Sequence, residues 1–333
     1  MVKVAKDQLI TLQRHATPPH VIILGAGASL AAFSSGDRNG RQLPLMKNIV
    51  EIVGLADELR DAHIDLHGDF EALYSQLYAD DPDAVCLRTI ERRIEDYFQQ
   101  MELPEWPTLY DLLLLSLREK DAVFTFNWDP FLFDAHKRNL GVAPLPKIYH
   151  LHGNVRIGVC EACRQSGERG QLCPSCGSPL APSRLLYPIK EKDYTSDTFI
   201  EGQWKLVEEY LSQAWYVTIF GYSAPNTDQE AIRIFTNAWR GESEEKLIER
   251  LEIINIGDES ELYSTWWDFA HFDHIDVRRS FFDSVLATYP RRTCEAHGYR
   301  SIEGEFVEEI PWPGNLDGLK NSVAELAEYE KEL

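Results

Sequence analysis

Short, mostly apolar runs divide the chain at intervals and predict the strands of a sheet. They lie at residues 20–24, 122–126, 147–151, 214–220 and 251–256. Runs of this length, rich in branched side chains, are typical of strands that are buried on both faces. We therefore expect an α/β fold with a Rossmann-like, mostly parallel sheet and helices on both of its faces.

A helical spacing of apolar residues fills most of the chain between the first two predicted strands. Phe70, Leu73 and Leu77 illustrate it within the segment 44–120. This segment is much longer than the single crossover helix of a simple strand–helix–strand unit. It predicts a helical insertion at about residues 35–120, which contributes to a small domain beside the sheet.

Further helices are expected near both ends of the chain and after the fourth strand, at 5–15, 229–240 and 315–333. In the last of these the apolar residues fall on one side of the helix, which is typical of a helix packed on a larger body. We therefore expect a main domain of residues 1–290 and a C-terminal extension of residues 291–333 that packs on it.

The charge of the chain limits its partners. Lysine and arginine number 33 and aspartate and glutamate 54, which gives a formal net charge of −21. Because this charge repels phosphate backbones, we expect no direct nucleic-acid binding. No apolar run approaches the roughly 20 residues that cross a bilayer, and the N-terminus lacks the apolar core of a signal peptide. We expect a cytoplasmic protein with no membrane contact.

Four of the six cysteines form two closely spaced pairs, at Cys160, Cys163, Cys173 and Cys176. Each Cys-x-x-Cys pair presents two thiolates on one side of a tight turn, and two pairs complete the tetrahedron that zinc prefers. Four sulfur ligands leave no position for water, so this zinc is expected to be structural. The spacing predicts a zinc ribbon at about residues 155–182, with a chance cluster or a redox dithiol as the alternatives.

The first predicted strand runs directly into a glycine turn, Gly25-Ala26-Gly27-Ala28-Ser29. Glycine lets the backbone approach a pyrophosphate closely, and dinucleotide-binding units begin with such a turn. However, Leu30 stands where the ordinary dehydrogenase fingerprint has its third glycine, and no acidic residue follows at the end of a second strand. The turn alone is compatible with phosphate binding and with tight packing.

Polar residues follow the second predicted strand in the segment Thr125-Phe126-Asn127-Trp128-Asp129. Open α/β sheets bind ligands at the carboxyl ends of their strands, so Asn127 and Asp129 are candidate site residues. Asp129 has a second interpretation, because Pro130 suits the first turn of a helix that an aspartate would cap.

A histidine ends the third predicted strand in the segment Leu151-His152-Gly153. The unperturbed pKa of imidazole, near 6.5, suits proton transfer at neutral pH. A lone histidine is equally compatible with a structural role, so the residue type alone leaves the function of His152 open.

Taken in order, these segments resemble the motifs of the sirtuin family. The resemblance covers roughly residues 20–290 and adds Gly221-Tyr222-Ser223 and the late Asn255 to the segments above. Each motif is short, but their order and spacing together are specific. The resemblance implies an enzyme that binds NAD as its substrate, breaks the nicotinamide–ribose bond and carries a structural Zn²⁺.

The resemblance also implies a role for each candidate residue. The residues expected to hold the NAD phosphates and the adenosine half are Gly25, Ala26, Gly27, Ser29, Gly221, Ser223 and Asn255. The residues expected to act at the nicotinamide side are Asn127, Asp129 and His152, with His152 as general base.

Two departures from the family pattern bear on the reaction. Deacylating sirtuins carry a Gly-Ile-Pro-Asp-Phe-Arg block after the serine, whereas this chain continues Leu30-Ala31-Ala32-Phe33. Tyr222 stands where the family has threonine, and the segment from Gly221 onward resembles divergent bacterial sirtuin-like proteins associated with phage defence, which tend to hydrolyse NAD.

We therefore expect hydrolysis of NAD to ADP-ribose and nicotinamide. NAD-dependent lysine deacylation, which the zinc ribbon favours, is the alternative, and a non-catalytic NAD or ADP-ribose sensor is the third interpretation. A regulatory protein partner or a homo-oligomer is expected to restrain an NAD hydrolase.

Overall fold

The computed structural model describes residues 18–61, 69–189, 194, 197–224, 228–240, 249–270, 274–303, 309 and 312–330. The helix expected at 5–15 lies outside these residues. None of the described helices combines the length and the apolar character needed to cross a bilayer.

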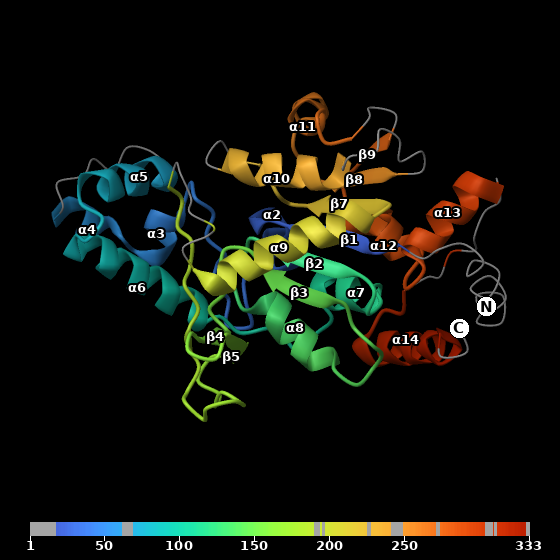
Figure 1. Ribbon diagram of the computed structural model, residues 1–333, viewed down its shortest axis with the longest axis horizontal. Helices are drawn as coiled ribbons and strands as arrows, with labels where there is room; N and C mark the ends of the chain where they lie inside the picture. Colours follow the sequence, from blue (N-terminus) through green and yellow to red (C-terminus); the bar gives the residue numbers. More distant parts are fainter. Residues whose placement is uncertain are drawn as a thin grey trace.

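A six-stranded sheet forms the centre of the protein (Figure 1). In chain order its strands are β1 (His20–Leu24), β2 (Ala122–Thr125), β3 (Lys147–His150), β7 (Tyr216–Phe220), β8 (Arg250–Ile254) and β9 (Ile275–Arg278). In space the order is β3-β2-β1-β7-β8-β9, and every neighbouring pair is parallel. The strand order reverses between β1 and β7, and at such a point a crevice opens outside the carboxyl ends of the strands.

The described helices, in chain order, are α2 (Ala26–Ala32), α3 (Ile49–Val53), α4 (Ala56–Asp61), α5 (Phe70–Asp80), α6 (Val85–Gln99), α7 (Leu109–Leu115), α8 (Phe131–Asn139), α9 (Thr198–Gln213), α10 (Gln229–Arg240), α11 (Glu259–Trp266), the 3₁₀ helix η3 (Phe281–Asp283), α12 (Val285–Thr288), α13 (Thr293–Glu303) and α14 (Leu316–Glu330). The predicted helices at 229–240 and 315–333 correspond to α10 and α14, the latter within the described residues.

Both faces of the sheet are buried, which explains why its strands read as continuous apolar runs. Val21 and Ile23 of β1 pack in one cluster with α9, α10 and α11. Ile22 and Leu24 face the other way and pack in a second cluster with α7, α8 and α14. The α/β fold with a parallel sheet and helices on both faces is therefore confirmed.

The helical insertion and the cysteine ribbon lie next to each other (Figure 1). The ribbon is a small antiparallel sheet of β4 (Ile157–Cys160), β5 (Gln165–Glu168) and β6 (Ala181–Pro182). Arg169 from the ribbon forms an ion pair of 2.5 Å with Glu95 on α6. Within the segment 35–120, the helices α3 to α6 stand to one side, whereas α7 packs against α8 under the sheet.

The C-terminal segment is tied to the body by a buried arginine. Arg291 donates to Glu330 through Nε at 2.7 Å and Nη2 at 2.6 Å, and its Nη1 donates to the carbonyl of Leu117 at 2.8 Å. Leu319 and Val323 on α14 belong to the core beneath the sheet. The segment thus contributes to the fold on the face opposite α9 and α10.

Candidate functional site

A cavity of about 570 Å³ opens at the carboxyl edge of the sheet. Its lining includes every residue that the sequence singles out for NAD binding or catalysis, namely Gly25, Ala26, Gly27, Ser29, Asn127, Asp129, His152, Gly221, Ser223 and Asn255. Open α/β sheets bind nucleotide-sized ligands at this reversal of strand order. The fold thus brings the predicted residues together, while the role of each stays a prediction.

The glycines of the site meet backbone to backbone. The N–H of Gly27 donates to the carbonyl of Gly221 at 2.9 Å, and that of Gly25 to the carbonyl of Phe220 at 3.0 Å. Gly221 has a φ of +64°, and a Cβ there would lie 2.1 Å from the nitrogen of Ala28. Tight packing is therefore one reason for these glycines, and phosphate binding stays a prediction.

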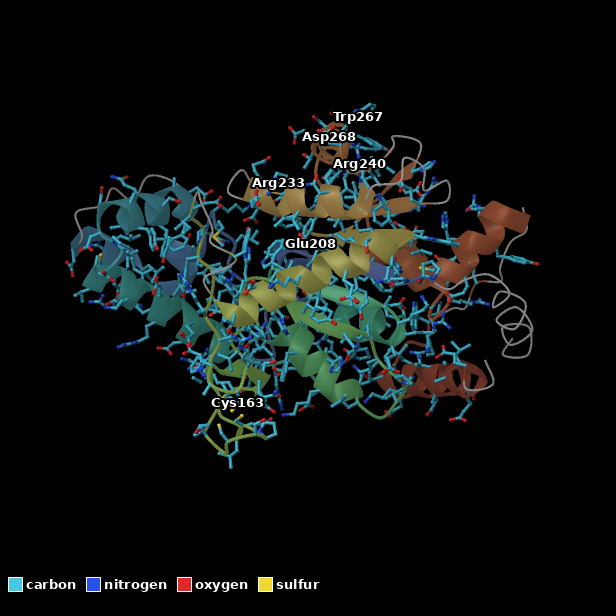
Figure 2. All side chains as sticks on the ribbon, in the orientation of Figure 1. Cys163, Glu208, Arg233, Arg240, Trp267 and Asp268 are labelled. Carbon is cyan, nitrogen blue, oxygen red and sulfur yellow. The ribbon has the colours of Figure 1, made fainter. Side chains whose placement is uncertain are left out.

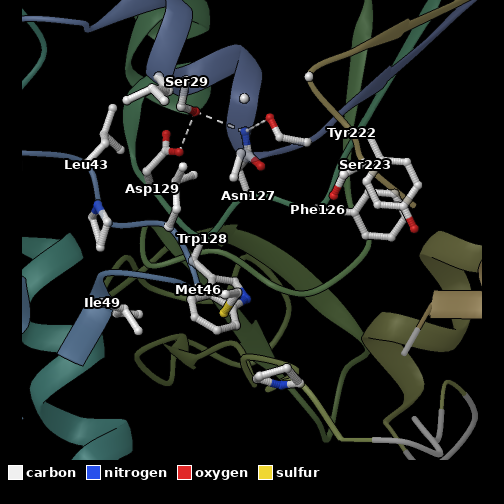
Figure 3. Close-up of a pocket in the computed structure, with 18 of the residues that line it drawn as sticks. Ser29, Leu43, Met46, Ile49, Phe126, Asn127, Trp128, Asp129, Tyr222 and Ser223 are labelled. Atoms are coloured by element: carbon white, nitrogen blue, oxygen red, sulfur yellow. Dashed lines mark hydrogen bonds between the residues drawn. The ribbon is translucent and has the colours of Figure 1, made fainter. Parts of the chain in front are cut away.

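The side chain of Asn127 is fixed by acceptors on its nitrogen side (Figure 3). Its Nδ2 lies 3.0 Å from the carbonyl oxygen of Gly25, 2.9 Å from Ser29 Oγ and 3.2 Å from the hydroxyl of Tyr110. Because a backbone carbonyl can only accept, the amide nitrogen must face Gly25. The amide oxygen of Asn127 consequently points away from these partners, where it can accept a hydrogen bond from a ligand or a water molecule.

Asp129 is a buried carboxylate that accepts hydrogen bonds from two donors. Ser29 Oγ donates to its Oδ2 at 2.6 Å, and the N–H of Phe131 donates to its Oδ1 at 3.2 Å. Burial raises the pKa of Asp129 to about 6, against the lowering effect of the Ser29 hydrogen bond. One oxygen thus holds the first N–H of α8 and the other lies in the cavity with Ser29, while a role of Asp129 in the reaction stays a prediction.

The hydroxyl of Ser29 has its full complement of partners. It donates its one proton to Asp129 and accepts from Asn127 at 2.9 Å and from Tyr110 at 2.5 Å. A hydroxyl has one proton and two lone pairs, so none is left for a phosphate. In this arrangement the Ser29 side chain orients Asp129 and Asn127, and the predicted contact with a phosphate could come only from its backbone.

His152 is held between the end of β3 and the chain that returns from the ribbon. Its carbonyl accepts from the N–H of Leu186 at 3.0 Å, and its ring meets the ring of Phe126 edge to face at 4.7 Å. The next residue, Gly153, has a φ of +75°, and a Cβ there would lie 2.0 Å from the carbonyl oxygen of Arg184. The ring of His152 is thus buried at the cavity in a fixed place.

On the predicted adenosine side, Ser223 and Asn255 also line the cavity. Asn255 Oδ1 accepts from the N–H of Gly257 at 2.9 Å, which shapes the loop after β8. Its amide nitrogen remains the group that can reach a ribose hydroxyl. This loop begins where β8 ends, as the ligand-binding loops of such sheets do.

Several lining residues were not identified from the sequence. An apolar wall comes from the segment that leads into α3, from the first residue of α3, from α6 and from the loop after β2. It comprises Leu43, Pro44, Leu45, Met46, Ile49, Phe98 and Trp128. On another side Tyr222 stacks on Phe126 at 4.3 Å and donates to Asp228 at 3.0 Å.

Tyr110 joins the site from α7 through its hydroxyl alone. In the sequence it stands in a leucine run, a context typical of core residues.

The four ribbon cysteines gather at one point. Their sulfur atoms all lie within 4.8 Å of one another, and the sulfurs of Cys160 and Cys176 are 3.6 Å apart. Zn–S bonds of about 2.3 Å in a tetrahedron place sulfurs about 3.8 Å apart. Figure 2 shows Cys163 at the outer end of the ribbon, away from the sheet. The donor set fits a structural zinc ion, as predicted.

No protein-family model matches the sequence, and no curated protein matches it either. Among solved structures, the chain is similar to a Sir2 homologue in complex with NAD, at 17% identity over 85% of this chain and 98% of that one, with a TM-score of 0.44. A mutant Sir2 homologue bound to ADP-ribose is similar at 15% identity over 89% of this chain and 98% of that one, with a TM-score of 0.43. Likeness of this degree assigns no activity, which depends on the residues of the site.

Proposed function

We propose that this protein cleaves the nicotinamide–ribose bond of NAD by hydrolysis, giving ADP-ribose and nicotinamide. One observation carries the proposal: the amide oxygen of Asn127, the carboxylate of Asp129 and the ring of His152 line one cavity at the strand-order reversal. The sequence resemblance to sirtuins and the NAD named for a similar solved structure support the choice of ligand.

Each of these groups has a task in the reaction. As the bond between the ribose carbon and the nicotinamide nitrogen breaks, its electron pair stays on nicotinamide and positive charge develops on the ribose. The Asp129 carboxylate stabilises that charge in a poorly solvated cavity. Asn127 accepts a hydrogen bond from the attacking water, and His152 takes the proton that this water loses.

Two differences from deacylating sirtuins support water as the acceptor. The Phe-Arg block of the family is missing after Ser29, and the segment from Gly221 onward, part of which lines the cavity, resembles sirtuin-like proteins that tend to hydrolyse NAD. The four-cysteine ribbon favours the deacylase interpretation, because it keeps the layout of those enzymes. We give more weight to the cavity, since function follows from the site rather than from the scaffold.

The test is nicotinamide release from NAD by the purified protein, with and without an acetyl-lysine peptide. Hydrolysis predicts release without peptide and a loss of roughly a hundredfold or more in His152→Ala. The matched control is His136→Gln on α8, a histidine outside the cavity, which should keep the activity of the natural sequence.

Other outcomes would identify another function. Turnover only with peptide, with formation of O-acetyl-ADP-ribose, would make the protein a deacylase. Tight ADP-ribose binding without nicotinamide release would make it a sensor.

An unrestrained NAD hydrolase would deplete the NAD of its own cell. We therefore propose that a regulatory protein partner or a homo-oligomer controls the activity and that its context is antiviral defence. Activity that is constant across protein concentrations and requires no partner would contradict this control.

A further inference from the structure

The hydroxyl of Tyr110 stands at the start of a one-way chain of hydrogen bonds that ends on Asp129. An ionised Asp129 can only accept, so Ser29 must give it its single proton, across 2.6 Å. Ser29 then has only lone pairs for Tyr110, so the Tyr110 hydroxyl must donate to Ser29, across 2.5 Å. The direction of every bond in this chain follows from the charge of its last member.

Tyr110 also limits the choices open to Asn127. The two protons of Asn127 Nδ2 face three acceptors, which are the carbonyl of Gly25, Ser29 Oγ and the hydroxyl of Tyr110. With three acceptors on one side, the side-chain amide cannot rotate by half a turn without setting its oxygen against acceptors. The oxygen that faces the cavity is therefore held in place partly by Tyr110.

Burial strengthens the hydrogen bonds among Tyr110, Ser29 and Asp129. Tyr110 and Ser29 are each 1% exposed and Asp129 is 4% exposed. Hydrogen bonds that are shielded from water polarise one another and orient charges more strongly than exposed ones. Loss of the Tyr110 hydroxyl leaves a space the size of one oxygen atom. Ser29 and Asn127, its two hydrogen-bond partners, would then have to rearrange.

The helix that carries Tyr110 is itself held rigidly. Thr108 and Asp111 form a capping box at the start of α7. Asp111 also accepts from Asn139 at 2.7 Å and pairs with Arg138, both on α8. Asp129 lies just before α8, so one rigid helix pair carries both Tyr110 and the carboxylate.

From this geometry we propose that Tyr110 is a positioning residue for NAD cleavage, acting through Ser29 and Asn127 without touching the substrate. The proposal rests on the proposed function, in which Asn127 orients the water and Asp129 stabilises the positive charge. It assigns a task to a residue that lies outside the cavity lining and belongs to none of the sequence motifs.

The test compares Tyr110→Phe with the natural sequence in steady-state NAD cleavage. The variant keeps the ring and loses the donor, so kcat should fall roughly tenfold or more while KM for NAD stays unchanged. The control is Tyr74→Phe, a buried tyrosine on α5 whose hydroxyl donates to Glu91 at 2.5 Å, outside the cavity. It should lose comparable stability and keep its kcat.

A second measurement does not need turnover. Ser29 donates less strongly to Asp129 once Tyr110 no longer donates to Ser29, so the pKa of Asp129 should rise above about 6 in Tyr110→Phe. Unfolding free energies measured against pH should show this upward displacement in Tyr110→Phe and not in Tyr74→Phe.

Natural kcat together with an undisplaced pH profile in Tyr110→Phe would overturn the proposal. A natural protein that releases no nicotinamide would refute the proposed function, and the pH profile of unfolding would still decide whether Tyr110 orients Asp129.

Discussion

Replacing Asp129 by asparagine removes a buried carboxylate and keeps the shape of the side chain. Folding raises the pKa of this carboxyl from 3.8 to about 6, chiefly because burial disfavours the charged form. The shift corresponds to about 3 kcal/mol. Since the folded state holds the proton more tightly, this contribution to stability is complete below a pH of about 4 and is lost as the pH rises through 6.

Urea unfolding of both proteins from about pH 4 to pH 8 measures this contribution. The natural sequence should lose about 3 kcal/mol more than Asp129→Asn between these limits. Glu252, whose pKa burial raises to about 7, titrates alike in both proteins, so its effect cancels. Any constant cost of the asparagine, for instance a weaker hydrogen bond from Phe131, cancels as well, because only the slopes are compared.

Activity gives the second half of the test. NAD cleavage should fall by roughly a hundredfold or more in Asp129→Asn, because the charge that stabilises the ribose cation is lost. In the natural sequence the rate should decline below about pH 6, as the Asp129 carboxylate takes up its proton. Parallel stability curves for the two proteins would refute the reasoning, since they would mean that folding does not raise the pKa of Asp129.

Two further predictions concern the scaffold of the site. Gly221→Ala should cost about 3 kcal/mol and abolish ADP-ribose binding in calorimetry, because its Cβ would lie 2.1 Å from the nitrogen of Ala28 at a φ of +64°. Gly141→Ala, with a φ of +84° and open space around the new Cβ, should cost only about 1 kcal/mol, and equal losses would contradict the close-packing argument. Zinc analysis should find one ion per chain, and Cys173→Ser should lose it together with thermal stability and NAD cleavage. The reason is that the chain leaving the ribbon donates from the N–H of Leu186 to the carbonyl of His152. A metal-free Cys173→Ser protein with natural activity would show that the ribbon does not position His152.

The sequence predicts the elements whose pattern is local. β1, β2 and β7 are apolar on both faces because helices cover both sides, so their runs are visible without a structure. The edge strand β9 was not predicted, since Ile275–Arg278 contains two charged residues and is only partly buried. Nor was α9, a 16-residue helix, although its buried residues recur at helical spacing on one face.

The residues of the candidate site also differ in whether the sequence predicts them. Residues that directly follow a strand could be predicted, because parallel strands bring their carboxyl ends to one edge of the sheet. Asn127, His152 and Asn255 are of this kind. Tyr110 and most of the apolar wall come from the insertion, and their place depends on how its segments pack. No short-range pattern marks such residues, because a tyrosine in a leucine run looks like any core tyrosine.

The cost of burying Asp129 argues that this network serves function rather than stability. A carboxyl that loses about 3 kcal/mol by ionising would be replaced at little risk if it only capped α8, a task for which a serine suffices. Among the described residues no cation pairs with it. A buried anion without a cation attracts positive charge, and the nicotinamide end of NAD becomes positive at the ribose as the bond breaks. The same cavity reaches the glycine turn, where the backbone allows the close approach of a pyrophosphate. Under the proposed function, we therefore expect the charge of the site to orient the dinucleotide, with the bond to be broken at Asp129.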